Sequence, residues 1–214
     1  KPSSIEKRVP IVGMACRFPG SANSLNDFWA LLSEGRDAIC EVPANRWDVD
    51  KYYSASVVQP GKMNTRWGGF IDDVDQFDPQ FFSISPHEAA EMDPQQRILL
   101  ETSWRAFEHA GITKEQLKGS NTGVFVGISN GDYLRLKCKK DPDFIDFNAY
   151  SGLGNAYSIA ANRISYVFDL RGPSVAVDTA CSSSLTAIHA AVKSILDGEC
   201  DTAIAGGINL MLAP

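Results

Sequence analysis

Cys181 stands where two sequence patterns meet in a way that could place a thiol for nucleophilic chemistry. The run before it, "SVAVD" (174–178), reads as a strand, and the residues after it repeat apolar side chains at helical spacing. The thiol would then lie at or just before a helix N-terminus. Unpaired backbone N–H groups and the positive end of the helix dipole favour a thiolate there, and the same N–H groups can stabilise an oxyanion on a bound thioester. Small neighbours would let a substrate carbonyl approach closely. These are the requirements of acyl transfer through sulfur.

The residues alone leave a second interpretation open for Cys181. A cysteine between a strand and a helix is as readily a small buried side chain. The serines at 182–184 fit the role of helix N-caps. They do not form a serine hydrolase elbow, because the two glycines of Gly-x-Ser-x-Gly are missing.

A nucleophilic thiol usually works with a histidine, and this chain has three. His189 is eight residues beyond Cys181 in the expected helix, about 12 Å along the axis and about 80° around it, so it cannot reach the sulfur. His109 falls in the last turn of a helix, where a structural role suits it. His87 lies near the start of a helical turn and is expected at the surface. Chemistry at Cys181 would need partners that this sequence does not contain.

Composition excludes several classes of function. The net charge of −6 argues against a nucleic-acid binder, and the one basic cluster, at 135–140, is interpreted as a solvated loop face that could alternatively meet an acidic partner. Five scattered cysteines without a CxxC pair predict neither disulfides nor a metal site, which suits a reducing, cytoplasmic setting. No apolar run approaches the roughly 20 residues of a membrane span, and no signal peptide is evident.

Two weaker patterns are also set aside. The run "SGLGNAYS" begins like a dinucleotide loop, but Tyr157 stands where the third glycine should be. The acidic run at 72–78 lacks the spacing of a calcium loop, so its side chains are expected to serve turns and caps.

The remaining patterns predict the elements that would position Cys181. The helix near 25–34 has Ser24 as its N-cap, and the helix from Pro94 has Asp93 as its N-cap and Gln96 as a capping-box partner. Residues 37–86 are expected to be irregular but packed by their aromatic side chains. The strands are expected to be hydrophobic throughout and to alternate with helices, which indicates an α/β layered fold. Strands are predicted at 9–18, 122–129, 174–178 and 202–212, and two further helices at 155–171 and 183–197. One face of the last helix is marked by apolar residues, namely Leu185, Ile188, Ala191, Val192, Ile195 and Leu196.

Five segments resemble the β-ketoacyl synthase domains of modular type I polyketide synthases, in the thiolase-like superfamily. They cover nearly the whole chain in the expected order, and the string Asp178-Thr179-Ala180-Cys181-Ser182-Ser183-Ser184 is the most specific. The segments are "PIVGMACRFPG", "FDPQFFSISPHEAAEMDPQQRILLETSWRAFEHAGI", "TGVFVGIS", "NRISYVFDLRGPSVAVDTACSSSLTAIHAA" and "AIAGGINLML".

The resemblance implies a fold, a mechanism and partners. The fold would be the layered αβαβα thiolase-like fold, with residues 1–9 as a linker end and 10–214 as the N-terminal half of the domain. Cys181 would accept an acyl chain from the phosphopantetheine arm of an acyl carrier protein, and its backbone N–H would serve the oxyanion hole. Decarboxylative Claisen condensation with a malonyl-type thioester would follow. Two histidines and a lysine of the family's second half would be required, so this fragment alone is expected to be inactive.

The resemblance also implies an assembly. The family is a homodimer in which the strand before the cysteine, here 173–179, pairs with its mate, and acyltransferase or other synthase domains flank it. Asn130 and Gly131 would lie near the subunit's own acyl tunnel. The loop 150–154, with Tyr150 and Gly152, would approach the partner's tunnel. No cofactor or metal is expected to be bound.

Two alternatives remain at this point. One is a non-elongating ketosynthase-like domain that transfers acyl chains or serves as a dimer scaffold. The other is a thiolase or the condensing domain of a fatty-acid synthase.

Overall fold

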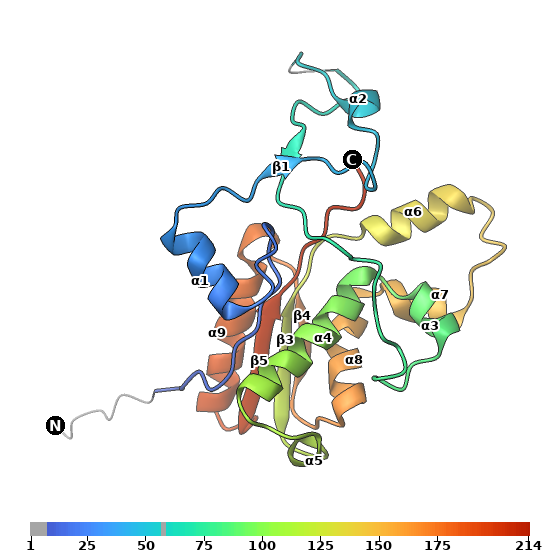
Figure 1. Cartoon of the computed structure of the whole chain (residues 1–214). Coiled ribbons are helices and arrows are strands. Elements are labelled where there is room, and N and C mark those ends of the chain that lie inside the picture. The colour runs from blue at the N-terminus through green and yellow to red at the C-terminus, as the bar shows by residue number, and fades with distance from the viewer. Residues whose placement is uncertain (1–7, 57–58) are drawn as a thin grey trace.

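The computed structural model describes residues 8–56 and 59–214, so most of the predicted linker end at 1–9 lies outside the described residues. Figure 1 shows the helices around a central sheet, with an extended lobe formed mainly by residues 37–72. The elements, with η1 a 3₁₀ turn, are α1 Leu25–Ser33, β1 Cys40–Glu41, α2 Val49–Tyr52, β2 Trp67–Gly68, α3 Pro86–Glu91, α4 Pro94–His109, α5 Lys114–Leu117, β3 Thr122–Gly127, α6 Asp132–Lys140, α7 Ala149–Asn155, α8 Tyr157–Phe168, β4 Ser174–Val177, η1 Ala180–Ser182, α9 Ser183–Leu196 and β5 Thr202–Gly207.

The central sheet has three parallel strands in the order β4-β3-β5. The register aligns the C-terminal end of β3 with both neighbours, because Gly127 pairs with Val177 on one side and with Gly207 on the other. The chain reaches β4 from β3 through α8, and it crosses back to β5 through α9. Since the two crossovers run in opposite directions, right-handed connections place α8 and α9 on opposite faces of the sheet.

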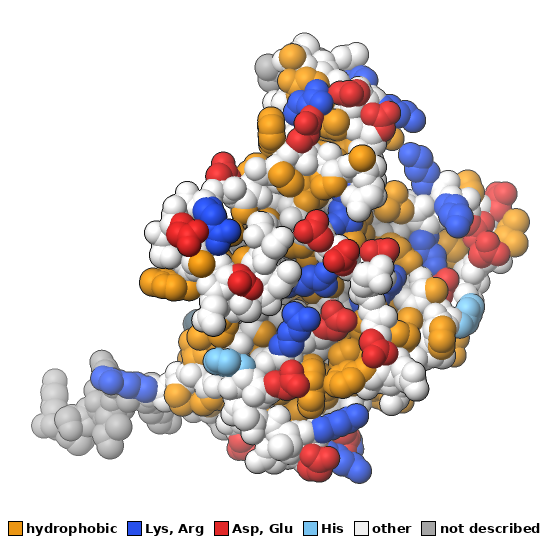
Figure 2. All heavy atoms as spheres, viewed as in Figure 1, with side chains coloured by type: hydrophobic (Ala, Val, Ile, Leu, Met, Phe, Trp, Pro, Cys, Tyr) orange, Lys and Arg blue, Asp and Glu red, His pale blue; other side chains and the backbone are white. Residues whose placement is uncertain are grey.

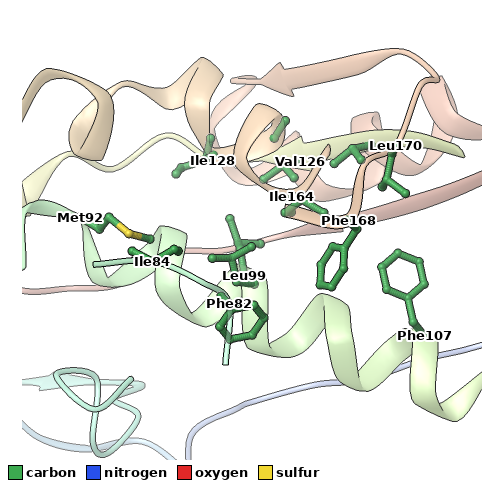
Figure 3. Packing of buried hydrophobic residues seen from close by; sticks show 14 of the residues in the cluster. Phe82, Ile84, Met92, Leu99, Phe107, Val126, Ile128, Ile164, Phe168 and Leu170 are labelled. Atoms are coloured by element: carbon green, nitrogen blue, oxygen red, sulfur yellow. The ribbon is translucent and has the colours of Figure 1, made fainter. Parts of the chain in front are cut away.

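Alternate side chains of β3 separate the two faces. Val124 and Val126 belong to the main core with α4 and α8, whereas Phe125 packs against α9. Figure 3 shows Phe107 of α4 and Phe168 of α8 turned toward each other in this core, and the centroids of their rings are 5.4 Å apart. The predicted α/β layers are therefore present as helix, sheet and helix, with β3 buried along its whole length.

The N-caps predicted for the helices after Ser24 and Asp93 are confirmed, with one correction. The hydroxyl of Ser24 accepts the N–H of Asp27, and the carboxylate of Asp93 accepts the N–H of Gln95. The capping box at Gln96 is wrong. Its side-chain amide instead donates to the carbonyl of Leu153, within α7, and to the carbonyl of Ala156, just after α7. Its amide oxygen accepts a hydrogen bond from the buried guanidinium of Arg163. A side chain committed to another helix cannot fold back onto its own N-cap.

The predicted buried strand at 9–18 is wrong. The segment is extended, but its backbone joins no sheet, and Ile11 and Val12 are 79% and 60% exposed. Gly13 lies directly against the backbone of α4, and the N–H of Met14 donates to Nδ1 of His109. The segment borders an open groove of about 1030 Å³, lined mainly by apolar side chains of α1, α9 and β5. The run is apolar enough for a strand, and the edge strand β5 lines the same groove, but the backbone of 9–18 forms no ladder with it.

Three other expectations on secondary structure are corrected. The basic cluster at 135–140 is not a loop, because it belongs to helix α6. The expected loop at 150–154 is inside helix α7, which starts with a capping box between Asn148 and Ser151. The last strand ends at Gly207, and the chain beyond it is irregular although Leu210 and Leu212 are buried.

The expectation for residues 37–86 is confirmed only in part. The segment has few regular elements, and Trp47 packs edge-on against Phe70. Trp67 and Phe81 nevertheless remain 59% and 50% exposed.

Figure 2 shows acidic and basic side chains interspersed over the face seen in Figure 1. Within residues 8–56 and 59–214, no helix is long and apolar enough to cross a membrane.

Candidate active site

Cys181 follows β4 at the carboxyl edge of the parallel sheet. The connection after β3 goes to the face of α8, and the connection after its neighbour β4 goes to the face of α9. Adjacent strands whose connections diverge leave a crevice at their carboxyl ends, and this is where open α/β sheets bind ligands. The fold thus places Cys181 at a position suited to chemistry.

The corner itself is a 3₁₀ turn, Ala180–Ser182, that leads directly into α9. Ala180 has φ of 54°, a left-handed conformation that non-glycine residues rarely adopt. The carboxylate of Asp178 accepts the Ala180 N–H at 3.0 Å, and the Ser183 hydroxyl donates to the Ala180 carbonyl at 2.7 Å. These bonds hold the residue before Cys181 in its strained geometry.

Hydroxyl groups brace the same turn from both sides. Ser183 Oγ accepts the N–H of Thr179 at 2.9 Å, and Ser182 Oγ donates to the carbonyl of Thr179 at 2.8 Å. Thr179 Oγ1 and Thr186 Oγ1 are 3.1 Å apart. Two of the serines expected as N-caps, Ser182 and Ser183, therefore act within the turn, and the Ser182 hydroxyl does not cap α9. The turn is one hydrogen-bonded unit around Cys181.

The geometry of Cys181 bears on the two interpretations left open by the sequence. Its side chain is exposed in this chain, which favours a nucleophile over a small residue packed in the core. In the part of the chain that the structure describes, its backbone N–H has no hydrogen-bond acceptor. A free N–H beside an exposed thiol can donate to the oxygen of a bound thioester, which is the arrangement that acyl transfer needs.

The buried face of α9 shares only Ala191 with the one predicted. Leu185 and Ile188 are 71% and 45% exposed, and Val192, Ile195 and Leu196 are half-buried. The buried residues are the small Ser183, Ala187, Ala191 and Ser194. Small residues let the helix lie close to β3 and β5, and hydrophobic periodicity alone cannot reveal such a face.

Residues that sequence reasoning missed lie under the loops after β3 and β5. Gln95 is buried, and its amide donates to the carbonyl of Asn130 and accepts the N–H of Leu210. The carboxylate of Asp132, also buried, accepts the N–H of Leu212 and the side-chain amide of Asn130. The network ties both loops to the start of α4. Buried polar residues at a helix start carry no periodic signal, so nothing in the sequence pattern pointed to them.

Burial shifts two pKa values near this edge. It raises the pKa of the Asp93 carboxyl, although hydrogen bonds from Gln95 oppose the change. It also raises the pKa of the Tyr157 phenol, and the nearby negative charge of Asp178 adds to this. The Tyr157 hydroxyl donates to the Ser129 carbonyl, and it fills the space that a Cβ on Gly131 would occupy. In both groups burial disfavours the charged form.

The other predicted tunnel residues have defined surroundings. Asn130 is half-buried and donates to the carbonyl of Leu210, so its amide serves the loop network. Tyr150 is 38% exposed and packs edge-on against the ring of His87. Gly152 is exposed, with open space where its Cβ would be. Their roles at an acyl tunnel, and that of Gly131, stay predictions.

No hydrogen bond or ion pair links a histidine to Cys181 within the described ranges 8–56 and 59–214. His109 accepts from the Met14 backbone, and His87 is exposed beside Tyr150. His189 is exposed on α9. The same ranges contain no group of three or more His, Cys, Asp or Glu side chains that could hold a metal ion.

A parallel α/β sheet with an exposed thiol at a strand-to-helix switch point is an arrangement suited to acyl transfer through a thioester. The family description "Beta-ketoacyl synthase, N-terminal domain" matches residues 6–214. The chain belongs to this family of acyltransferases, which form carbon–carbon bonds. It is a ketosynthase N-terminal domain of the modular polyketide synthase type.

Curated relatives and solved structures agree on this assignment. The chain is 50% identical over 211 residues to a phenolphthiocerol/phthiocerol polyketide synthase polypeptide of Mycobacterium tuberculosis, covering 99% of this chain and 14% of that protein. It is 49% identical to a second phenolphthiocerol/phthiocerol polyketide synthase polypeptide, from Mycobacterium bovis, covering 100% of this chain and 12% of that protein. The chain thus spans about a seventh or less of these relatives.

Solved ketosynthase structures share the fold. An oxazolomycin ketosynthase domain from Streptomyces albus superposes with a TM-score of 0.87 at 46% identity, covering 95% of this chain and 34% of that one. The ketosynthase from module 6 of the bacillaene synthase of Bacillus subtilis gives 0.82 at 40% identity, covering 95% and 32%. The thiolase-like α/β fold predicted from the sequence is therefore confirmed over this chain.

Proposed function

We propose that this chain carries the nucleophile of a ketosynthase that extends polyketide chains. The Cys181 thiolate attacks the carbonyl of an acyl chain on the phosphopantetheine thiol of an acyl carrier protein. The carbon–sulfur bond to the carrier breaks, the carrier leaves as a thiol, and an acyl-cysteine remains. The observation that carries the proposal is the exposed Cys181, with its free backbone N–H, at the carboxyl edge of the sheet.

Condensation follows on the acyl-cysteine. A malonyl-type thioester on a carrier protein loses carbon dioxide, and the resulting carbanion attacks the acyl carbonyl. The carbon–carbon bond forms as the Cys181 thiolate leaves, so the product is a β-ketoacyl chain two backbone carbons longer. The Cys181 N–H stabilises the oxyanion in both steps. The three histidines of this chain make no hydrogen bond to Cys181 in the described residues, so the fragment alone is proposed to be inactive in condensation.

The proposed partners are an acyl carrier protein, a second ketosynthase subunit and flanking synthase domains. The relatives support this, because two of them are subunits of large polyketide synthases. The tunnel roles of Asn130, Gly131, Tyr150 and Gly152 are part of the same proposal. No bound cofactor is proposed, since the substrates arrive on the carrier's phosphopantetheine.

Acylation of the full-length polypeptide tests the nucleophile. An acyl-N-acetylcysteamine thioester is added, and the modified residue is located by mass spectrometry of peptides. We expect the acyl group on Cys181 and a loss of at least about a hundredfold in acylation rate for Cys181→Ala, because no other group supplies a positioned thiolate.

Cys40 offers a matched control, since it is also an exposed free cysteine. Cys40→Ala is expected to acylate at the wild-type rate. Equal acylation of Cys181→Ala and wild type would show that another residue is the nucleophile. Acylation at Cys181 without condensation would instead indicate the non-elongating, acyl-transferring alternative.

A further inference from the structure

We propose that Gly127 and Gly207 position Cys181, by forming a flat seat on which the first turn of α9 rests. The inference builds on the proposed role of Cys181 and adds the residues that aim its thiol. The two glycines end β3 and β5 and are paired across the parallel ladder. Both lie on the sheet face that packs against α9, two residues beyond Phe125 and Ala205 of the α9 cluster.

The space above Gly127 is filled by the backbone of α9. A Cβ at this position would lie 2.6 Å from the carbonyl carbon of Ser183 and 2.7 Å from the nitrogen of Ser184. Those atoms belong to the helix itself and cannot rotate away as a flexible side chain could. A side chain at Gly127 would therefore push the whole first turn of α9 away from the sheet.

Gly207 supports the same turn from the neighbouring strand. A Cβ here would lie 2.6 Å from the Cβ of Ser184 and 3.3 Å from its Cα. The next residue back, Gly206, has nothing within 4 Å of a Cβ. The close approach is thus specific to the pair under α9 and is not a general property of the glycines in β5.

Displacement of this turn must reach the thiol. Ser183 rests over Gly127, and its hydroxyl bonds both the N–H of Thr179 and the carbonyl of Ala180. Cys181 lies between these anchor points. A shift of about 1 Å in a reacting group can cost around a hundredfold in rate. The seat therefore sets where the Cys181 sulfur and its backbone N–H meet a thioester.

The contact between Gly207 and Ser184 permits a compensating experiment. Gly207→Ala introduces the clashing Cβ, and Ser184→Gly removes the atom that it would meet. The variants Gly207→Ala, Ser184→Gly and the double variant are prepared in the full-length polypeptide, with Gly206→Ala as the matched control. Melting temperatures and circular dichroism show that each is folded, and Gly127→Ala is added if it also folds.

Acylation by an acyl-N-acetylcysteamine thioester is then measured at increasing thioester concentration. We expect Gly207→Ala to lower the saturating rate about tenfold to a hundredfold and to leave the half-saturating concentration within about twofold. The double variant should recover most of the rate. Gly206→Ala and Ser184→Gly should stay within about threefold of wild type. A merely structural role would change the melting temperature without this selective loss and recovery.

Alkylation of Cys181 by iodoacetamide, followed by peptide mass spectrometry, separates the two proposals. Alkylation needs no acyl transfer. We expect the alkylation rates to follow the same order as the acylation rates, with Gly207→Ala slowest and the double variant restored. If Gly207→Ala were alkylated and acylated as fast as Gly206→Ala, the role of the seat would be overturned and the nucleophile would remain intact. Wild-type protein that is not acylated at Cys181 would overturn the nucleophile, and the alkylation rates would then decide on the seat.

Discussion

Ala180 shows how single residues shape the corner. Its φ of 54° is favourable for glycine but costs an alanine about 1 kcal/mol. Two hydrogen bonds hold it there: its N–H donates to the carboxylate of Asp178, and its carbonyl accepts from the hydroxyl of Ser183. Strain of this kind persists where the surrounding structure over-determines a residue, and it gathers at functional sites. The residue before the thiol is therefore fixed by its neighbours against its own preference.

Ala180→Gly tests this strain. Glycine relieves the left-handed conformation in the folded state but gains freedom in the unfolded state, so we expect the free energy of unfolding to stay within about 0.5 kcal/mol of wild type. Ala190→Gly, in the middle of α9, has no strain to relieve and should lose about 1 kcal/mol. Urea unfolding measures both. Equal losses for the two variants would contradict the strain at Ala180.

Glu91 shows how elements near the site are held together. Its carboxylate, at the end of α3, accepts hydrogen bonds from Lys137 of α6 and Ser151 of α7. Burial raises the pKa of Glu91, but these hydrogen bonds and the charge of Lys137 outweigh burial, so the pKa lies below its ordinary value. His87 lowers it slightly further. One carboxylate thus joins three helices, including the one that carries Tyr150.

Glu91→Gln should destabilise the fold in a pH-dependent way. A carboxyl whose pKa is lower in the folded state stabilises that state above its unfolded pKa, about 4.3, and loses this as the pH falls through the folded value. We expect a loss of about 1–3 kcal/mol at pH 7 that shrinks below about pH 4. Urea unfolding at several pH values measures it.

Asp197→Asn is the control for this prediction. It removes an exposed pair with Lys193 within α9, which should be worth about 0.5 kcal/mol or less. A loss at Glu91→Gln that stayed constant down to pH 3 would show that the ionised carboxylate is not what joins the helices.

At the scale of the whole molecule, β4 is a free edge of the sheet among the described residues. The carbonyls of Pro173 and Val177 accept N–H groups from or just after β3, so the backbone groups of Ala176 face outward. Val175 beside them is 38% exposed. An unpaired parallel edge is suited to pairing with a second copy, as the predicted dimer requires.

Val175→Asp should therefore weaken the dimer of the full-length polypeptide. In the predicted pairing of β4 with its mate, the two new aspartates would lie in the interface, where like charges cost several kcal/mol, so we expect the dissociation constant to rise at least about a hundredfold. Sedimentation velocity measures it. Trp67→Asp, at an exposed apolar residue of β2, should leave the dimer intact. An unchanged dimer in Val175→Asp would place the interface elsewhere.

The sequence by itself determined the features whose signals are local. Caps such as Ser24 and Asp93 act within one turn, and the apolar run of β3 shows its burial along its own length. The strand-to-helix corner at Cys181 is equally local. The resemblance then favoured a nucleophile over a packed thiol, a choice that the residues alone left open.

Only the tertiary structure decided the features that depend on partners distant in sequence. The run at 9–18 is as apolar as a strand but is not paired with β5, the edge strand that lines the same groove, and α9 turns its small residues toward the sheet. Gly127 and Gly207 are 80 residues apart, and their joint contact with the turn after Cys181 exists only because the register pairs them. Close approach of backbones is a property of packed elements, and no pattern along one segment encodes it.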